Sequence, residues 1–219
     1  MGASLGADWA RAWITASAEV LAENRVALIT LDRAIGDGDH GENMDRGFQA
    51  ALGKLDELPD SATPGDVFKV VATTLISTVG GAAGPLYGTA FLKASLAVGA
   101  AERLDGPALV LALTAARDGV VLRGKAESGD KTMIDAWTPA VDAAAAAAEA
   151  GLSPHEVLNA AADAAERGAE ATEPLVARKG RASYLGERAI GHRDPGAQSS
   201  ALLLRAAEQV ARAGAGATS

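Results

Sequence analysis

The chain has 219 residues, of which 48% are hydrophobic, and a formal net charge of −8 at pH 7. This length predicts one well-buried domain over residues 1–219 rather than two domains. The acidic balance argues against nucleic acid or an anionic membrane surface as a partner, because both select for basic patches. Cysteine is absent, so any metal must be held by oxygen or imidazole ligands.

The sequence shows no sign of membrane insertion or export. No segment approaches the ~18 uninterrupted apolar residues that a membrane span requires. The first residues carry Asp8 and no basic stretch before an apolar run, unlike a secretory signal peptide. We therefore expect a cytoplasmic protein that binds no membrane.

Helical periodicity dominates the chain, and no convincing alternation of apolar and polar residues is present. Trp9, Trp13 and Val20 fall on one helical face, and the same spacing recurs further along. Antiparallel helices joined by loops make an all-α domain. The predicted helices span about residues 7–31, 44–55, 63–75, 86–102, 107–121, 131–150, 154–171 and 198–212.

Capping residues mark two of these helix starts. Thr63, followed by Pro64 at the first helical position, predicts the start of the third helix. The sequence SPHE at residues 153–156 is a capping box, which predicts the helix over 154–171. Pro139 should kink or restart its helix. Residues 173–195 are predicted to form a loop, and the tail over about 213–219 to fray.

The segment LDRAIGDGDHGENMDRG, residues 31–47, crowds carboxylates and glycines after the first predicted helix. Asp32, Asp37 and Asp39 can point at one spot if the loop folds back. Three close carboxylates repel one another unless a divalent cation neutralises them. Hard oxygen ligands suit Mg²⁺ or Ca²⁺, but the spacing lacks the closing Glu of an EF-hand. We therefore predict a Mg²⁺ site that stays open to phosphate oxygens.

Glycine-rich segments between the helices supply what a phosphate needs. The segment STVGGAAGPLYG, residues 77–88, can present backbone N–H groups to an anion. Standard nucleotide motifs are missing, because GKAESGDKT lacks the ending of a P-loop and GDGDHG does not follow a strand. The residues alone predict a helical domain that binds a phosphorylated ligand through Mg²⁺. For any single glycine loop, a tight interhelical turn is the alternative interpretation.

Four segments together resemble one known family. They are IGDGDHGENMDRGF (35–48), STVGGAAGPLYGTAF (77–91), RGKAESGDKTMIDAW (123–137) and ARKGRASYLGERAIGHRDPGAQS (177–199). In this order they are similar to the nucleotide-binding subunit of bacterial dihydroxyacetone kinase, the form driven by the phosphoenolpyruvate phosphotransferase system. The resemblance covers nearly the whole chain. It implies a barrel of eight antiparallel amphipathic helices, with the nucleotide bound by the loops at one end.

The resemblance also implies which residues hold the ligands. Asp32, Asp37 and Asp39 would bind two Mg²⁺ ions that bridge the phosphates of ADP or ATP. Arg178, favoured over Arg181, would position the phosphoryl group together with His40, and no catalytic nucleophile is required. The nucleotide-contacting positions are His40, Gly41, Glu42, Asn43, Ala82, Ala83, Gly124, Met133, Arg178, Asp194, Pro195 and Gly196.

In a kinase of this type, ADP is a retained cofactor. A phosphohistidine protein of the phosphotransferase system supplies the phosphoryl group, and a separate dihydroxyacetone-binding subunit holds the acceptor. These proteins are the implied partners, with a homodimer as a further option. One alternative is the nucleotide-binding subunit of an ATP-dependent kinase for dihydroxyacetone or another small ketose or tetrose. Another is a non-enzymatic nucleotide sensor that binds a regulator. His40 followed by Asn43 and the segment MDRG favours the first interpretation.

Overall fold

The structure is a computed structural model, and it describes residues 4–216. Within these residues the fold is helical, apart from one isolated bridge between Leu5 and Leu104. The prediction of an all-α fold is therefore confirmed. The helices are α1 (Ala7–Glu23), α2 (Arg25–Ile35), α3 (His40–Leu55), α4 (Pro64–Thr78), α5 (Ala83–Val98), α6 (Gly106–Gly124), α7 (Ile134–Glu149), α8 (Pro154–Ala171), the 3-10 helix η1 (Arg181–Ala189) and α9 (Pro195–Gly216).

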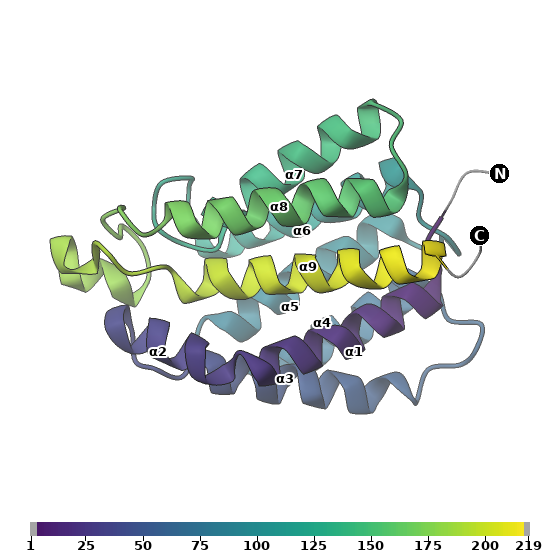
Figure 1. The fold of residues 1–219 in the computed structure, drawn as a ribbon. Helices are drawn as coiled ribbons and strands as arrows, with labels where there is room; N and C mark the ends of the chain where they lie inside the picture. The colour runs from purple at the N-terminus through teal and green to yellow at the C-terminus, as the bar shows by residue number, and fades with distance from the viewer. Residues whose placement is uncertain (1–3, 217–219) are drawn as a thin grey trace.

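The long helices form a closed ring (Figure 1). α1 contacts α3, α3 contacts α4, and the series continues through α8 and α9 until α9 returns to α1. α2 extends from the end of α1, so the ring in the described part of the chain has eight positions. Neighbours in the ring run in opposite directions, which puts every connection at one of the two barrel ends. The structure thus agrees with the predicted antiparallel barrel.

The predicted first helix over residues 7–31 is wrong, because the structure has two helices there. Asn24 separates α1 from α2 with φ −92° and ψ 4°, and its Nδ2 donates to the Val20 carbonyl at 2.8 Å. α2 then continues to Ile35. Asp32 projects from the last turn of α2.

Other helix boundaries also differ from the prediction, chiefly those of α5 and α7. α5 begins at Ala83 and ends at Val98, because Gly99 adopts the left-handed φ of 53°. α7 begins at Ile134 and includes Pro139 within the helix. Both helices therefore start beside the glycine-bearing segments that precede them.

The C-terminal region also contains more helix than predicted. The predicted loop over 173–195 includes η1, and α9 begins at Pro195 and continues to Gly216. Of the predicted frayed tail, residues 213–216 are helical and residues 217–219 lie outside the described part of the chain. Among the described residues, no helix combines the length and apolarity needed to cross a membrane.

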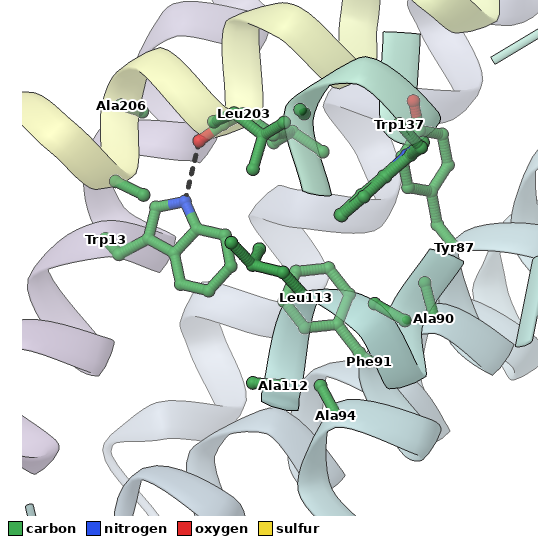
Figure 2. Close-up of a cluster of buried hydrophobic side chains, with 14 of the residues drawn as sticks. Trp13, Tyr87, Ala90, Phe91, Ala94, Ala112, Leu113, Trp137, Leu203 and Ala206 are labelled. Atoms are coloured by element: carbon green, nitrogen blue, oxygen red, sulfur yellow. Dashed lines mark hydrogen bonds between the residues drawn. The ribbon is translucent and has the colours of Figure 1, made fainter. Parts of the chain in front are cut away.

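Aromatic rings and small side chains fill the barrel interior (Figure 2). Trp9 and Trp13 stack with ring centroids 5.4 Å apart, and Trp13 meets Phe68 edge-on at 5.6 Å. Both indole N–H groups donate to carbonyls of α9, Trp9 to Ala207 at 3.1 Å and Trp13 to Leu203 at 2.8 Å. Many buried alanines let the helix axes approach closely. This packing fixes the helix ends that carry the loops.

Both predicted capping sites are confirmed. Thr63 Oγ1 accepts from the Asp66 N–H at 3.2 Å, and the Thr63 N–H donates to Asp66 Oδ2 at 2.9 Å. Ser153 and Glu156 form the same reciprocal pair at the start of α8. Both sites lie at the barrel end opposite the α2–α3 loop, where α1 begins and α9 ends (Figure 1).

Candidate functional site

Four segments meet at the barrel end formed by the α2–α3 loop (Figure 1), and their side chains surround a cavity. The other three are the α4–α5 loop, the α6–α7 loop and the segment that runs from α8 through η1 to α9. The cavity volume is about 200 Å³, and a second cavity of about 410 Å³ shares Leu86, Met133 and Lys179 with it. The glycine-bearing segments that the sequence analysis singled out therefore meet in one place.

The carboxylates of Asp32, Asp37 and Asp39 converge at this cavity. One oxygen from each lies within 4.8 Å of the other two. Asp32 is only 8% exposed, and its Oδ2 accepts from the backbone N–H groups of Asp39 at 2.9 Å and His40 at 3.1 Å. These bonds fold the loop back onto α2. The structure thus brings together the three side chains that were predicted to bind metal.

Gly36 and Gly38 make this tight turn feasible. A Cβ at position 36 would lie 2.1 Å from Asp32 Oδ1, so only glycine leaves the carboxylate in place. Gly38 adopts φ 78°, which side chains other than glycine rarely adopt. Glycine at both positions is therefore a geometric requirement of the acidic cluster.

The charge around the cluster fits a hard divalent cation. Arg181 of η1 pairs with Asp37, with 2.6 Å between Nη1 and Oδ2. Within residues 4–216, Asp32 and Asp39 form no ion pair, so negative charge remains at the cavity. Several carboxylate oxygens without sulfur or imidazole ligands are typical of Mg²⁺ or Ca²⁺ sites.

The turn of Gly80 and Gly81 forms the opposite wall of the cavity. A Cβ on either glycine would meet only the amide of Asn43, at 3.8 and 4.0 Å, so the turn is open on its cavity side. Asn43 is buried, and its Oδ1 accepts from Arg46 Nη2 at 2.6 Å. α5 begins directly after this turn, with Ala82 as its N-cap. An open glycine turn at a helix N-terminus is a favourable place for a phosphate.

His40 is held at the cavity wall through one ring nitrogen. Its Nε2 lies 2.8 Å from Ser199 Oγ, which in turn lies 2.7 Å from the buried Tyr87 hydroxyl. The Tyr87 hydroxyl also donates to the Gly196 carbonyl at 3.1 Å. Burial lowers the pKa of the His40 imidazole, although the charges of Asp32 and Asp39 oppose this shift. The network links the start of α3 to the first turn of α9.

Asp194, Pro195 and Gly196 form the turn that opens α9, and all three line the cavity. Asp194 Oδ2 accepts from the Ala197 N–H at 2.7 Å, and the Asp194 N–H donates to Thr172 Oγ1 at 2.9 Å. Burial raises the pKa of the Asp194 carboxyl to about 7, and the Ala197 N–H opposes the rise.

The second cavity is more apolar and lies between α5, α6 and the start of α7. Leu86, Val120, Met133 and Ile134 line it, together with Gly124 at the end of α6. Apolar walls beside a polar phosphate site suit a flat nucleobase. Gly124 and Met133, which were predicted to contact the nucleotide, both line this cavity.

Three of the predicted nucleotide-contacting residues line neither cavity. Arg178 is exposed and contacts the Asp130 carbonyl through its backbone N–H at 3.0 Å, while Arg181 reaches the cavity. Gly41 lies where α2 crosses α3, because a Cβ there would approach the Arg25 carbonyl to 2.2 Å. Glu42 is exposed in the first turn of α3. Arg181 and not Arg178 thus lines the cavity in this structure, and the preference for Arg178 stays a prediction.

The structure also places residues at the site that sequence reasoning missed. The cavity lining includes Lys131 and Tyr87, and Ser199 lies behind His40. All of them fall within the four quoted segments, so the motifs contained the signal.

Comparisons with known proteins point to one family. The pattern of the DAK2 domain family matches residues 34–209. A Listeria innocua protein named PEP-dependent dihydroxyacetone kinase 1, ADP-binding subunit DhaL, is 47% identical over 91% of this chain and 94% of its own. The Escherichia coli protein named PEP-dependent dihydroxyacetone kinase, ADP-binding subunit DhaL, is 45% identical over 88% of this chain and 91% of its own.

A solved structure shows the same fold within a longer chain. The crystal structure of the dihydroxyacetone kinase from C. freundii in complex with AMP-PNP and Mg²⁺ is matched with a TM-score of 0.70 and 27% identity, over 95% of this chain and 35% of that chain. The matches confirm the family resemblance carried by the four motifs and the prediction of a kinase. The chain therefore belongs to the DAK2 domain family.

Proposed function

We propose that this protein is the ADP- and Mg²⁺-carrying subunit of a phosphoenolpyruvate-dependent dihydroxyacetone kinase in the cytoplasm. A phosphohistidine protein supplies the phosphoryl group, and a separate subunit holds the dihydroxyacetone that receives it. The observation that carries the proposal is the convergence of Asp32, Asp37 and Asp39 across the cavity from the open turn of Gly80 and Gly81. Relatives named as PEP-dependent and PTS-dependent ADP-binding subunits support the choice of donor.

The three carboxylates would hold Mg²⁺, and we propose two ions. Bound Mg²⁺ neutralises phosphate charge and orients the phosphate oxygens for transfer. Asp32 is preorganised for this role, because two backbone N–H groups fix its Oδ2. Asp37 can exchange its present partner, the exposed Arg181 side chain, for a metal ion.

The chain contributes positioning and charge, and no residue has to form a covalent intermediate. Backbone N–H groups of the turn before α5 would bind phosphate oxygens, with His40 and Asn43 on the facing wall. Of the two candidate arginines we assign the phosphate contact to Arg181, because it lines the cavity. The adenosine group would occupy the apolar cavity beside Gly124 and Met133.

The first test is to identify the nucleotide that the purified protein retains. The protein is exchanged extensively into nucleotide-free buffer containing Mg²⁺ and then denatured, and the released material is analysed by mass spectrometry. Near-stoichiometric ADP would support a retained carrier. An empty protein that binds added ATP with Mg²⁺ would favour an exchanging, ATP-dependent kinase, and a protein that binds neither would contradict the proposal.

A matched pair of variants tests the metal site. Asp37→Asn removes one ligand charge at nearly constant shape, while Asp60→Asn makes the same change in an exposed turn at the opposite barrel end. We expect Asp37→Asn to lose retained nucleotide and to abolish dihydroxyacetone phosphorylation in a reconstitution with purified partner subunits. Asp60→Asn should behave like the parent protein. Unchanged phosphorylation by Asp37→Asn would refute the proposed role of the carboxylates.

The alternative of an ATP-dependent kinase for dihydroxyacetone or another small ketose or tetrose has two supporting observations. The C. freundii kinase that shares the fold was solved with AMP-PNP, an ATP analogue. The Mycolicibacterium smegmatis protein named L-erythrulose 1-kinase is 35% identical to this chain, which covers 33% of its length. A domain of this type therefore also occurs within longer kinases that are named for another sugar. The retained-nucleotide measurement separates the two functions.

A further inference from the structure

Lys131 is buried in a way that the proposed function does not explain. Its side chain is 1% exposed, although lysine is among the residues least often buried without a partner. Its backbone adopts φ 62°, a left-handed conformation that is costly for a residue other than glycine. The surrounding structure must therefore stabilise both the burial and the backbone conformation.

The Lys131 ammonium is satisfied entirely by backbone carbonyls. Nζ donates to the carbonyls of Thr172 at 2.6 Å and Glu173 at 3.2 Å, and also to the carbonyl of His192. An ammonium group has three N–H donors, so each has an acceptor. The first two carbonyls lie just beyond the C-terminus of α8, where the helix dipole favours a positive charge.

These contacts join three segments that are distant in the sequence. Residues 172–173 follow α8, residues 191–194 lead into α9, and Lys131 lies in the α6–α7 loop. The Gly191 N–H donates to the Glu173 carbonyl at 2.8 Å, and the Asp194 N–H donates to Thr172 Oγ1. The ammonium therefore lies at the centre of a junction of backbone and side-chain bonds.

The segments on both sides of this junction line the first cavity. Thr132 and Met133 follow Lys131 directly and line both cavities. On the other side, Asp194 and Gly196 line the first cavity, which also contains the three carboxylates. The position of each wall relative to the other thus depends on the bonds that Nζ makes.

We propose that Lys131 is a positioning residue, whose ammonium holds the turn of Asp194, Pro195 and Gly196 against the start of α7 and so sets the width of the nucleotide pocket. The inference rests on the proposed function in one respect, since the pocket is taken to hold ADP. The N–H donors are essential to this role, because an apolar side chain of the same length fills the space but donates no hydrogen bond.

The test compares Lys131→Met with two controls. Lys69→Met removes an exposed lysine of α4, and Ser95→Ala removes a buried hydrogen bond, from Ser95 Oγ to the Gly65 carbonyl at 2.7 Å, far from the cavity. Backbone amide hydrogen exchange is measured without nucleotide, and the dissociation rate of ADP is measured in Mg²⁺. The exchange measurement does not depend on the proposed function, whereas the ADP measurement does.

We expect Lys131→Met to accelerate exchange at Asp194 and Ala197 and to speed ADP dissociation by about tenfold or more, as the loss of hydrogen bonds from a charged donor implies. Ser95→Ala should lower stability but leave both quantities unchanged. Parent-like exchange at these amides in Lys131→Met would overturn the inference. If ADP does not bind the parent protein, the proposed function fails, and the exchange result alone decides the role of Lys131.

A second pair covers the case in which Lys131→Met does not fold. Thr172→Val removes the Oγ1 acceptor of the Asp194 N–H but keeps the carbonyl that receives Nζ, and Thr172→Ser restores the hydroxyl. Faster ADP dissociation in Thr172→Val, with recovery in Thr172→Ser, would support the junction as the element that sets the pocket. Equal rates in both variants would overturn it.

Discussion

At Gly36 the backbone passes so close to Asp32 that a methyl group has no room. We predict that Gly36→Ala displaces the Asp32 carboxylate, since the new Cβ would lie 2.1 Å from Oδ1. The expected destabilisation is about 1–3 kcal/mol, as for other overpacked sites, together with the loss of stabilisation by Mg²⁺. Thermal unfolding with and without Mg²⁺ and ADP measures both effects.

Gly53 provides the matched control for this substitution. It lies within α3, and a Cβ there would meet nothing within 4 Å. Gly53→Ala should therefore stabilise the protein by about 0.5–1 kcal/mol, because alanine loses less backbone entropy in a helix. If Gly36→Ala kept the full response to Mg²⁺, Asp32 would not be a ligand in the arrangement described.

The raised pKa of Asp194 makes stability depend on pH. Burial raises this pKa to about 7, well above its value in an unfolded chain. Between about pH 4 and pH 7 the unfolded chain loses a proton that the folded protein keeps, so the free energy of unfolding falls as pH rises. The decrease in the free energy of unfolding is complete above the pKa of Asp194 in the folded protein. It is absent below the pKa of Asp194 in the unfolded chain.

We predict that Asp194→Asn flattens this part of the pH profile. The amide oxygen still accepts from the Ala197 N–H but the side chain carries no charge. The variant should therefore become more stable relative to the parent protein as pH rises. Urea unfolding without nucleotide, at pH steps between about 5 and 8, measures the slope. Asp60→Asn should retain the parent slope, and an identical slope in Asp194→Asn would show that another group titrates.

At the scale of helices, the sequence predicted correctly those helix boundaries that depend on contacts within one helical turn. The capping box at Ser153 and Glu156 gave the start of α8 correctly, because both partners lie within one turn. The break at Asn24 was missed, since apolar spacing continues across it and the sequence does not show that α2 must turn toward α3. Gly180 lies between Arg178 and Arg181 and adopts φ 65°, so the two arginines take different directions. Residue spacing alone could not predict which of the two reaches the cavity.

We predict that removing the Ser153 cap affects stability without affecting the cavity. Ser153→Ala should cost about 1 kcal/mol, because the Glu156 N–H loses its acceptor at the exposed start of α8. Thr73→Ala, in the exposed middle of α4, should change stability by less than about 0.5 kcal/mol. Urea unfolding and ADP retention are measured for both. A loss of ADP retention in Ser153→Ala would contradict the separation of the two barrel ends.

At the scale of the whole molecule, the antiparallel ring explains how four separated segments form one site. In such a ring every second connection returns to the same end, and the α2–α3, α4–α5, α6–α7 and α8–α9 connections are the four that meet. The motifs could therefore be assigned to one site from the sequence once the helix count was known. The contacts between the motifs could not be predicted from the sequence, because the cavity walls depend on hydrogen bonds between distant segments, such as those of Lys131.

A ligand that bridges these four connections should stabilise the molecule from one end. We predict that Mg²⁺ with ADP, at about 100 times its dissociation constant, adds about 2.7 kcal/mol to the free energy of unfolding. Amide exchange should slow in residues 36–43, 79–84, 125–133 and 178–196, and stay unchanged in the opposite connections, residues 56–63, 99–105 and 150–153. Chelation of Mg²⁺ should reverse both effects. Equal protection at both ends would mean that the ligand acts on the barrel core, in which case the carboxylate cluster and the glycine turn would not be its binding site.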